Sequence, residues 1–360
     1  MLFRSSMAPG AESSLGIAAM LELAKLVKAQ KPARTVMFLA TSGHFQALSG
    51  MRAWISKHYT ELHENRLRVA AFLALDISSM TQNVGLFYKG MFYDEREDIQ
   101  RDFADFARVC RETSEQIALT MGVEPTDLFS DAVNPVAGKP WRVYLPGKIA
   151  LDNEPFTLGG GMGMAFVTTN DARPTVDTPY DTFEKVRFKN VLIQTRFLAA
   201  LFDKILNDAS MPVRGGPHFD RLFVTGGFAR VNGRIVEFDP TVSFFPDSPI
   251  PKSLAVYRSA NKTLMGVKGD IIEMVNETGE FSMDGIPPSN AYDGKRPVRF
   301  EAYKLDEKTG GITYAPDRGA QGATIYPLEF PITSGIKGCT LVVFKCQPMQ
   351  LFELVDPQSL

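Results

Sequence analysis

The strongest constraint on the fold is a change of pattern partway along the 360-residue sequence. The first part alternates segments of helical periodicity with short, continuous apolar runs, which are typical of strands buried on both faces. Such alternation predicts an α/β domain with a mostly parallel sheet flanked by helices. The expected helices are at 15–28, 46–59, 95–121 and 189–206, and the expected strands are at 35–41, 68–76 and 164–169.

The first expected helix carries one apolar stripe, made of Ile17, Leu21, Ala24 and Val27. Residues at this spacing share a helix face, so the pattern predicts an amphipathic helix. The run TVMFLAT at 35–41 has no polar residue between its two threonines, and it predicts a strand covered on both sides.

The pattern changes near residue 210. The segment MPVRGGP at 211–217 is expected to link two domains, because Pro and Gly favour turns over continued helix. Short β runs separated by turn residues follow it, and they predict a C-terminal β-sandwich. The expected domains are therefore 1–210 and 218–360. The expected strands of the second domain are at 222–225, 234–238, 254–258, 270–275, 298–303 and 340–345.

Composition excludes several classes of protein. An apolar fraction of 44% is too high for a disordered chain, and 39 basic against 41 acidic residues argue against a nucleic-acid-binding surface. No apolar run is long enough to span a bilayer, and residues 1–7 contain no secretory signal.

Of the three cysteines, Cys110 is expected to be a buried free thiol. Cys339 and Cys346 are either free thiols, which we favour, or a pair across a hairpin.

Four ordered segments resemble the zinc exopeptidase family of bacterial leucyl aminopeptidase and glutamate carboxypeptidase. They are PGAESSLGIAAMLELA at 9–24, FLATSGHFQALSGMRAW at 38–54, ALD at 74–76 and VDTPYDTFEKV at 176–186. The resemblance implies the α/β fold of that family and suggests an exported protein. The family also has an upstream H-x-D motif at a strand end. This motif has no counterpart in the sequence, so we expect the domain to lack its N-terminal part.

The resemblance also implies a set of site residues. In this family His, Asp and Glu side chains hold two zinc ions, and a Glu serves as general base. Asp76, Asp177 and Glu12 fall at metal-ligand positions, and His44 falls at the general-base position. Phe45, at another ligand position, has no donor atom. We therefore expect Glu12, His44, Asp76 and Asp177 to converge at the carboxyl edge of the sheet, with zinc bound weakly or not at all.

Each of these residues also has a purely structural interpretation. Asp76 at a strand end can cap a turn, and His44 can be an ordinary loop residue. Glu12 precedes a helix, where the helix dipole favours a carboxylate regardless of function. Asp177 and Asp181 lie in a stretch where side-chain turns are expected without metal, and Asp181 is expected to orient the loop.

The second domain resembles the carboxypeptidase regulatory-like domain, a transthyretin-type sandwich, over 222–290. The segments GRIVEF at 233–238, IPKSLAV at 250–256 and NETGEF at 276–281, with GIP at 285–287, carry this resemblance. Asn276 and Gly279 are suited to a tight hairpin between two strands, and Phe281 is expected to face the core.

These observations favour a peptidase-like protein with a degenerate metal site and little or no activity, acting as a module that binds or organises a peptide or protein ligand. The alternative is an active metal-dependent exopeptidase with a rearranged site. A third interpretation, a carbohydrate-binding protein, needs exposed aromatic residues on one sheet face. Its candidates are Phe244, Phe245 and Tyr257.

Overall fold

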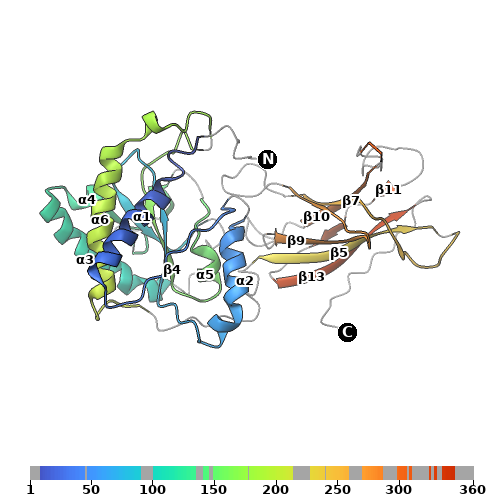
Figure 1. The fold of residues 1–360 in the computed structure, drawn as a ribbon, viewed down its shortest axis with the longest axis horizontal. Helices are drawn as coiled ribbons and strands as arrows, with labels where there is room; N and C mark the ends of the chain where they lie inside the picture. The colour runs from blue at the N-terminus through green and yellow to red at the C-terminus, as the bar shows by residue number, and fades with distance from the viewer. Residues whose placement is uncertain are drawn as a thin grey trace. The chain divides into compact units, whose positions relative to one another are not determined.

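The structure is a computed structural model with two compact units. One unit contains Leu2–His44 and Gly50–Arg221, and the other contains Met1, Phe45–Ser49 and Leu222–Leu360. Figure 1 shows helices around a small sheet in the first unit and strands in the second. No helix in the described parts of the chain has both the length and the apolar character needed to cross a bilayer. The structure describes residues 9–44, 47–90, 100–134, 141–145, 149–176, 178–213, 228–239, 241–258, 270–286, 298–305, 308–309, 324–325, 328–330 and 335–344.

The first unit is built on a four-stranded sheet in the order β1-β4-β2-β3. β1 and β4 are parallel, as are β2 and β3, but β2 runs antiparallel to β4. The sheet is therefore mixed, where the sequence predicted a mostly parallel one. The strands are β1 (Phe72–Asp76), β4 (Gly163–Thr168), β2 (Val84–Phe87) and β3 (Phe129–Asp131).

The central strand β4 is covered on both faces. Met164 and Phe166 join the core that packs against the long helices, whereas Ala165 and Val167 belong to a second cluster on the opposite face. All six residues of β4 are buried, which is why its sequence is continuously apolar instead of alternating. This strand confirms the expectation for 164–169.

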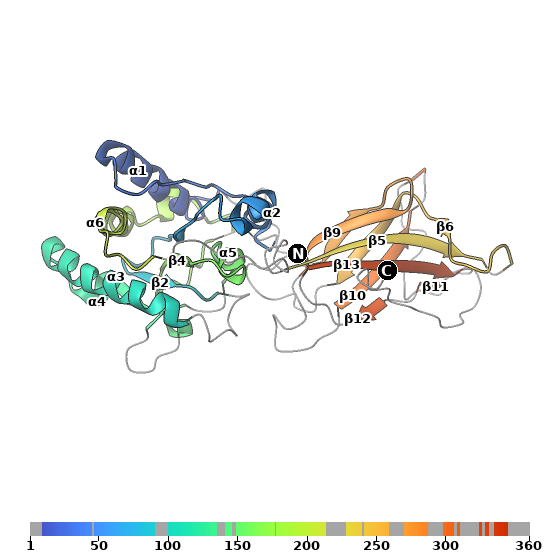
Figure 2. The ribbon, with the colours of Figure 1, turned by 90° about the horizontal axis from the view of Figure 1, so that it is seen from below.

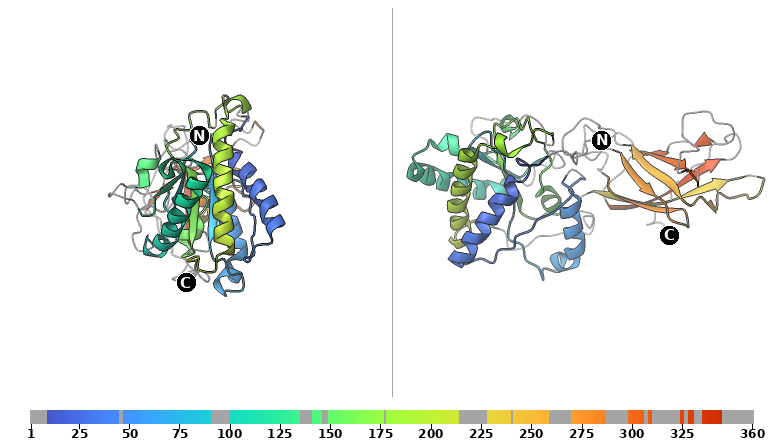
Figure 3. Two further views of the ribbon diagram at one scale, coloured as in Figure 1. Left: turned by 90° about the vertical axis from the view of Figure 1, so that its left-hand side faces the viewer. Right: turned by 45° about the horizontal axis from the view of Figure 1, so that its top comes forward.

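Helices cover both faces of this sheet (Figure 2). On one face, α6 lies between α1 and α3 and contacts both of them (Figure 3). Buried residues of α2 and α5 form a separate cluster with each other. Helices match all four expected segments, and the expected starts at residues 46 and 95 lie outside the described residues. The helices are α1 (Leu15–Gln30), α2 (Ser49–His63), α3 (Gln100–Met121), α4 (Pro125–Leu128), α5 (Glu154–Leu158) and α6 (Phe188–Asn207).

The prediction of a strand at 35–41 is wrong. These residues form neither helix nor strand, and Met37 and Phe38 are 62% and 39% exposed. A strand needs a neighbour to pair its backbone amides and carbonyls. Within the described residues β1 pairs with β4 alone, and no strand lies on its other side. The apolar run consequently stays unpaired despite its composition.

The apolar stripe predicted on α1 is not the face that the helix buries. The helix buries Leu15, Ala19 and Leu23, whereas Ile17 and Leu21 are 45% and 55% exposed. A close approach accounts for this orientation. A Cβ at Gly16 would lie 2.7 Å from the backbone oxygen of Leu75, so the helix meets β1 at the face that carries Gly16.

The second unit contains two sheets that share one core. The first sheet, β12-β10-β7-β8, is antiparallel. The second has the order β11-β13-β5-β6, with β9 also paired to β5, and β13 runs parallel to β5. The strands are β5 (Ala229–Phe238), β6 (Ser248–Pro249), β7 (Ser253–Arg258), β8 (Ile271–Met274), β9 (Glu280–Ile286), β10 (Val298–Lys304), β11 (Thr324–Ile325), β12 (Leu328–Phe330) and β13 (Gly335–Phe344).

Side chains from both sheets form this core. Phe281 packs there as expected, together with Phe300 and Tyr257. Because Tyr257 is buried, it is not available on a sheet face for a sugar ligand. The expected strand at 222–225 lies outside the described residues, and strands match the other five predicted segments of this unit.

The turn predicted at Asn276 and Gly279 forms, but the predicted hairpin is wrong, because this turn joins β8 of one sheet to β9 of the other and the two strands do not pair. The amide of Gly279 donates to the backbone oxygen of Asn276 (3.0 Å), and the Asn276 side chain accepts the amides of Thr278 and Glu280. Gly279 has φ +77°, a left-handed conformation that favours glycine.

The two described cysteines, Cys110 and Cys339, are free thiols. Burial raises the pKa of both, that of Cys339 to about 12. Both are thus neutral, packed thiols at physiological pH. Cys346 lies outside the described residues.

We predict that Gly16→Ala destabilises the protein although alanine is the better helix former by about 1 kcal/mol. The new methyl group would overlap the carbonyl oxygen of Leu75 and push α1 away from β1. Thermal unfolding should show a lower Tm for Gly16→Ala. Ile17→Ala, at an exposed position of the same helix, is the control and should leave Tm nearly unchanged. An unchanged or raised Tm for Gly16→Ala would contradict this close packing.

Candidate functional site

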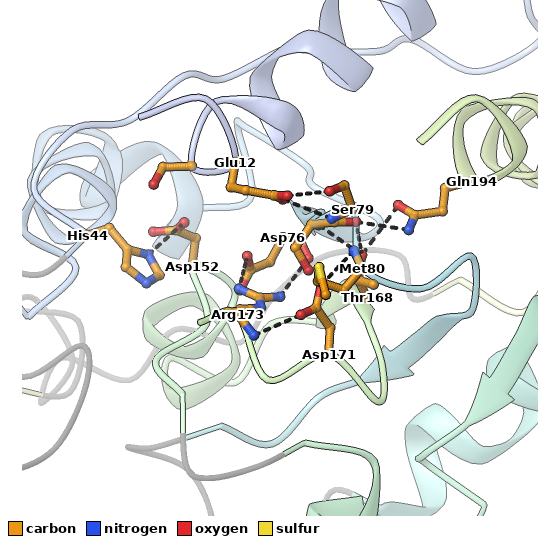
Figure 4. A network of polar contacts seen from close by, with 12 residues as sticks. Glu12, His44, Asp76, Ser79, Met80, Asp152, Thr168, Asp171, Arg173 and Gln194 are labelled. Carbon is orange, nitrogen blue, oxygen red and sulfur yellow. Dashed lines mark hydrogen bonds and ion pairs between the residues drawn. The ribbon is translucent and has the colours of Figure 1, made fainter. Parts of the chain in front are cut away.

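The candidate site lies where β1 and β4 end. The two strands are parallel, so the segments that follow them leave the sheet at the same edge. Asp76 is the last residue of β1, and Arg173 lies in the loop that follows β4. Nη1 of Arg173 lies 2.7 Å from Oδ1 of Asp76, and Nη2 donates to the backbone oxygen of Asp76 at 3.1 Å (Figure 4). The ion pair therefore joins the ends of two strands that are far apart in the sequence.

Asp171 fixes the position of Arg173. This buried carboxylate accepts the amide of Arg173 at Oδ1 (2.7 Å) and the amide of Met80 at Oδ2 (3.1 Å). Arg173 has φ +48°, in a region where a non-glycine residue is strained by about 1–2 kcal/mol. The hydrogen bonds around Asp171 hold the loop in this conformation, and they direct the guanidinium toward Asp76.

Glu12 is buried at the same edge, in the turn before α1. Its carboxylate accepts the amide of Ser79 (2.9 Å) and the Ser79 hydroxyl. Burial raises the pKa of Glu12. The nearby Asp171 and Asp181 add to this rise, whereas the hydrogen bonds from Ser79 oppose it. Glu12 thus acts in this structure as a buried acceptor for Ser79.

Asp181 holds the turn that carries Glu12. Its carboxylate accepts the Glu12 amide (2.6 Å) and the Ser13 hydroxyl (3.0 Å), and its backbone oxygen accepts the Ala11 amide (3.2 Å). This buried aspartate orients the loop, which is the structural role that the sequence predicted for it.

His44 has a separate partner. Its Nδ1 lies 3.2 Å from Oδ2 of Asp152, and both side chains are partly exposed. Figure 4 shows His44 beside Asp152, at some remove from the bonds of Glu12 and Asp76. The sequence-predicted residues Glu12, His44 and Asp76 thus lie around one region, but each is engaged with a different partner. Asp177 and Phe45 lie outside the described residues.

The described residues do not fit a zinc ion. Among them, no group of three or more His, Cys, Asp or Glu side chains is arranged to hold a metal. The carboxylate of Asp76, at one of the metal-ligand positions that the resemblance implies, is paired with a guanidinium. The carboxylate of Glu12 is bonded to Ser79.

Sequence reasoning missed Asp152, Asp171 and Arg173. A signal for two of them was present, because the polar stretch Asn170-Asp171-Ala172-Arg173 directly follows the buried run at 164–169. Residues just after the carboxyl end of a buried parallel strand lie at the edge where α/β folds place their sites. Asp152 had no comparable signal, since it lies before a short helix that was not expected.

Comparison with known proteins identifies the family. The sequence matches the family model of peptidase family M28 over residues 5–200. Two solved structures of BSAP, a zinc aminopeptidase from Bacillus subtilis, are similar to this chain. One has a TM-score of 0.40 and 16% identity and covers 59% of this chain and 47% of that chain. The other has a TM-score of 0.39 and 15% identity and covers 60% and 47%.

This chain therefore spans about half the length of the solved structures that it matches. The search of curated proteins found no match. The family model covers more than half of the sequence, including the turn that carries Glu12, strands β1 and β4 and the loop of Arg173. The chain belongs to peptidase family M28.

Proposed function

We propose that this M28 chain is a peptidase-like protein with a degenerate metal site, which binds or organises a peptide or protein ligand and has little or no peptidase activity. The observation that carries the proposal is the ion pair between Asp76 and Arg173. A guanidinium is charged at every physiological pH and matches the geometry of a carboxylate. It supplies the positive charge that the Asp76 carboxylate would otherwise obtain from a metal ion.

Replacing this guanidinium by a metal would be costly. Arg173 is mostly buried, so displacing it from Asp76 would leave its charge without that partner in a poorly solvated place. It would also break the bond from Nη2 to the backbone oxygen of Asp76. Metal binding at this site is favourable only if its free energy exceeds the cost of losing both interactions.

The other candidate donors support the same conclusion. Glu12 is bonded to Ser79, and the Nδ1 atom of His44 is close to Asp152. When zinc is bound in enzymes of this kind, it supplies a Lewis acid and an activated water. In this chain the residues at the corresponding positions instead join loops to one another. We therefore propose that Asp76 and Glu12 stabilise this edge of the sheet, and that His44 is a surface residue without a catalytic role.

The proposal includes two domains. Residues 1–210 form the peptidase-like domain, and residues 218–360 form a β-sandwich that is regulatory-like at 222–290. Two observations support the sandwich: two sheets share the core around Phe281 and Phe300, and the turn at Asn276 and Gly279 connects β8 of one sheet to β9 of the other.

The first test is metal content and activity. We expect protein purified without chelator to hold at most one zinc ion per chain, weakly, because the donors of the site are already engaged. Hydrolysis of aminoacyl-nitroanilide substrates should not exceed background. Two tightly held zinc ions, with activity that is lost in Asp76→Ala, would establish an active exopeptidase instead.

The second test is a double-mutant cycle on the ion pair. Asp76→Asn and Arg173→Met should each lower the free energy of unfolding, and the two effects should be strongly non-additive. A coupling of about 1–2 kcal/mol is expected, since the pair is shielded from water but not fully buried. Chemical denaturation of the wild type, both single variants and the double variant measures it. Additive effects would mean that the two side chains do not stabilise each other.

The third test uses the pH dependence of Glu12. Because its pKa is raised in the folded protein, this group favours folding below its ordinary value of 4.5. That contribution is lost as pH rises through the folded pKa. The Gln side chain stays neutral at every pH. The Tm of Glu12→Gln minus the Tm of the wild type should therefore increase as pH rises from 4 to 7. Glu115→Gln, at an exposed position of α3, is the control and should show no such trend.

A further inference from the structure

The loop between β5 and β6 presents large apolar side chains to solvent. Val242, Phe244 and Phe245 are 82%, 95% and 72% exposed. Elsewhere in this unit, the described phenylalanines Phe281 and Phe300 are buried in the core. We call the three residues Val242, Phe244 and Phe245 the apolar loop tip. Three large apolar side chains within four residues differ from the scattered exposed residues of an ordinary surface.

Hydrogen bonds within the loop hold this conformation. The amides of Val242 and Ser243 both donate to the backbone oxygen of Asp239 at 3.0 Å. The Thr241 amide donates to Oδ1 of Asp239 (3.0 Å), and the Phe245 amide donates to the Ser243 hydroxyl (3.1 Å). The loop is therefore preorganised, and little ordering cost remains when the tip contacts another surface.

The shape and size of the tip favour a lipid surface over a protein. A stable protein interface takes about 20–30 residues from each partner, far more than one short loop supplies. In Figure 2 the segment between β5 and β6 extends beyond the ends of the two strands that it joins, so the tip lies on a projection. The boundary between headgroups and acyl chains of a bilayer accepts a small apolar projection, and aromatic side chains are suited to that depth.

The charges of the loop select the kind of lipid. Residues 239–251 contain two aspartates and no Lys, Arg or His. The loop thus has nothing that attracts an anionic headgroup. We propose that the apolar loop tip inserts into the surface of a bilayer of zwitterionic lipid, and that Val242, Phe244 and Phe245 provide the binding energy.

The experiment is flotation of the full chain with phosphatidylcholine vesicles. We expect measurable, reversible binding, because binding strength scales with the apolar area that is buried in the lipid. The triple variant V242S/F244S/F245S should bind at least ten-fold more weakly. The control is I272S/M274S, which changes two exposed apolar residues of β8 outside the tip and should bind as the wild type does.

A second measurement tests insertion directly. Relative to the wild type, Phe244→Trp should add emission that shifts to the blue on vesicle binding and is quenched by lipids brominated on the acyl chain. Adding phosphatidylglycerol to the vesicles should not strengthen binding. The proposal is overturned if the wild type does not bind, if the triple variant binds equally well, or if binding depends on anionic lipid.

Discussion

The parallel pairing of β1 with β4 is the constraint on which the candidate site depends. It places the segment after Asp76 and the loop of Arg173 at one edge, although the two residues are 97 positions apart in the sequence. Without that register, the Arg173 guanidinium would not lie within hydrogen-bond distance of the Asp76 carboxylate. The buried faces of β4 fix the register, because a slip of one residue would move Met164 and Phe166 to the opposite face.

The same kind of sequence pattern led to opposite outcomes in this chain. The apolar runs at 164–169 and 35–41 both predict a buried strand, and only the first forms one. An apolar composition indicates that a segment can be buried. A strand also requires a paired neighbour on at least one side. β4 has neighbours on both sides, whereas the run at 35–41 pairs with no strand within the described residues. Sequence periodicity cannot supply that information.

The site was predictable in the same partial way. The motif positions and strand ends predict Glu12 and Asp76 at one edge, and in the structure both residues make contacts near the end of β1. Their partners were not predictable, because these depend on loop conformation. Arg173 reaches Asp76 from a backbone with φ +48°, a conformation that no simple propensity assigns to arginine.

The fold and the site are held by different residues, so a substitution at the site need not disturb the core. The core around α6 and β4 is apolar and uses none of Glu12, Asp76 or Arg173. A metal site does two things: it supplies charge, and it ties together the loops that carry its ligands. Here Arg173 supplies the charge at Asp76, while Asp171 and Asp181 tie the loops together through backbone amides. These bonds connect the loops at this edge to one another.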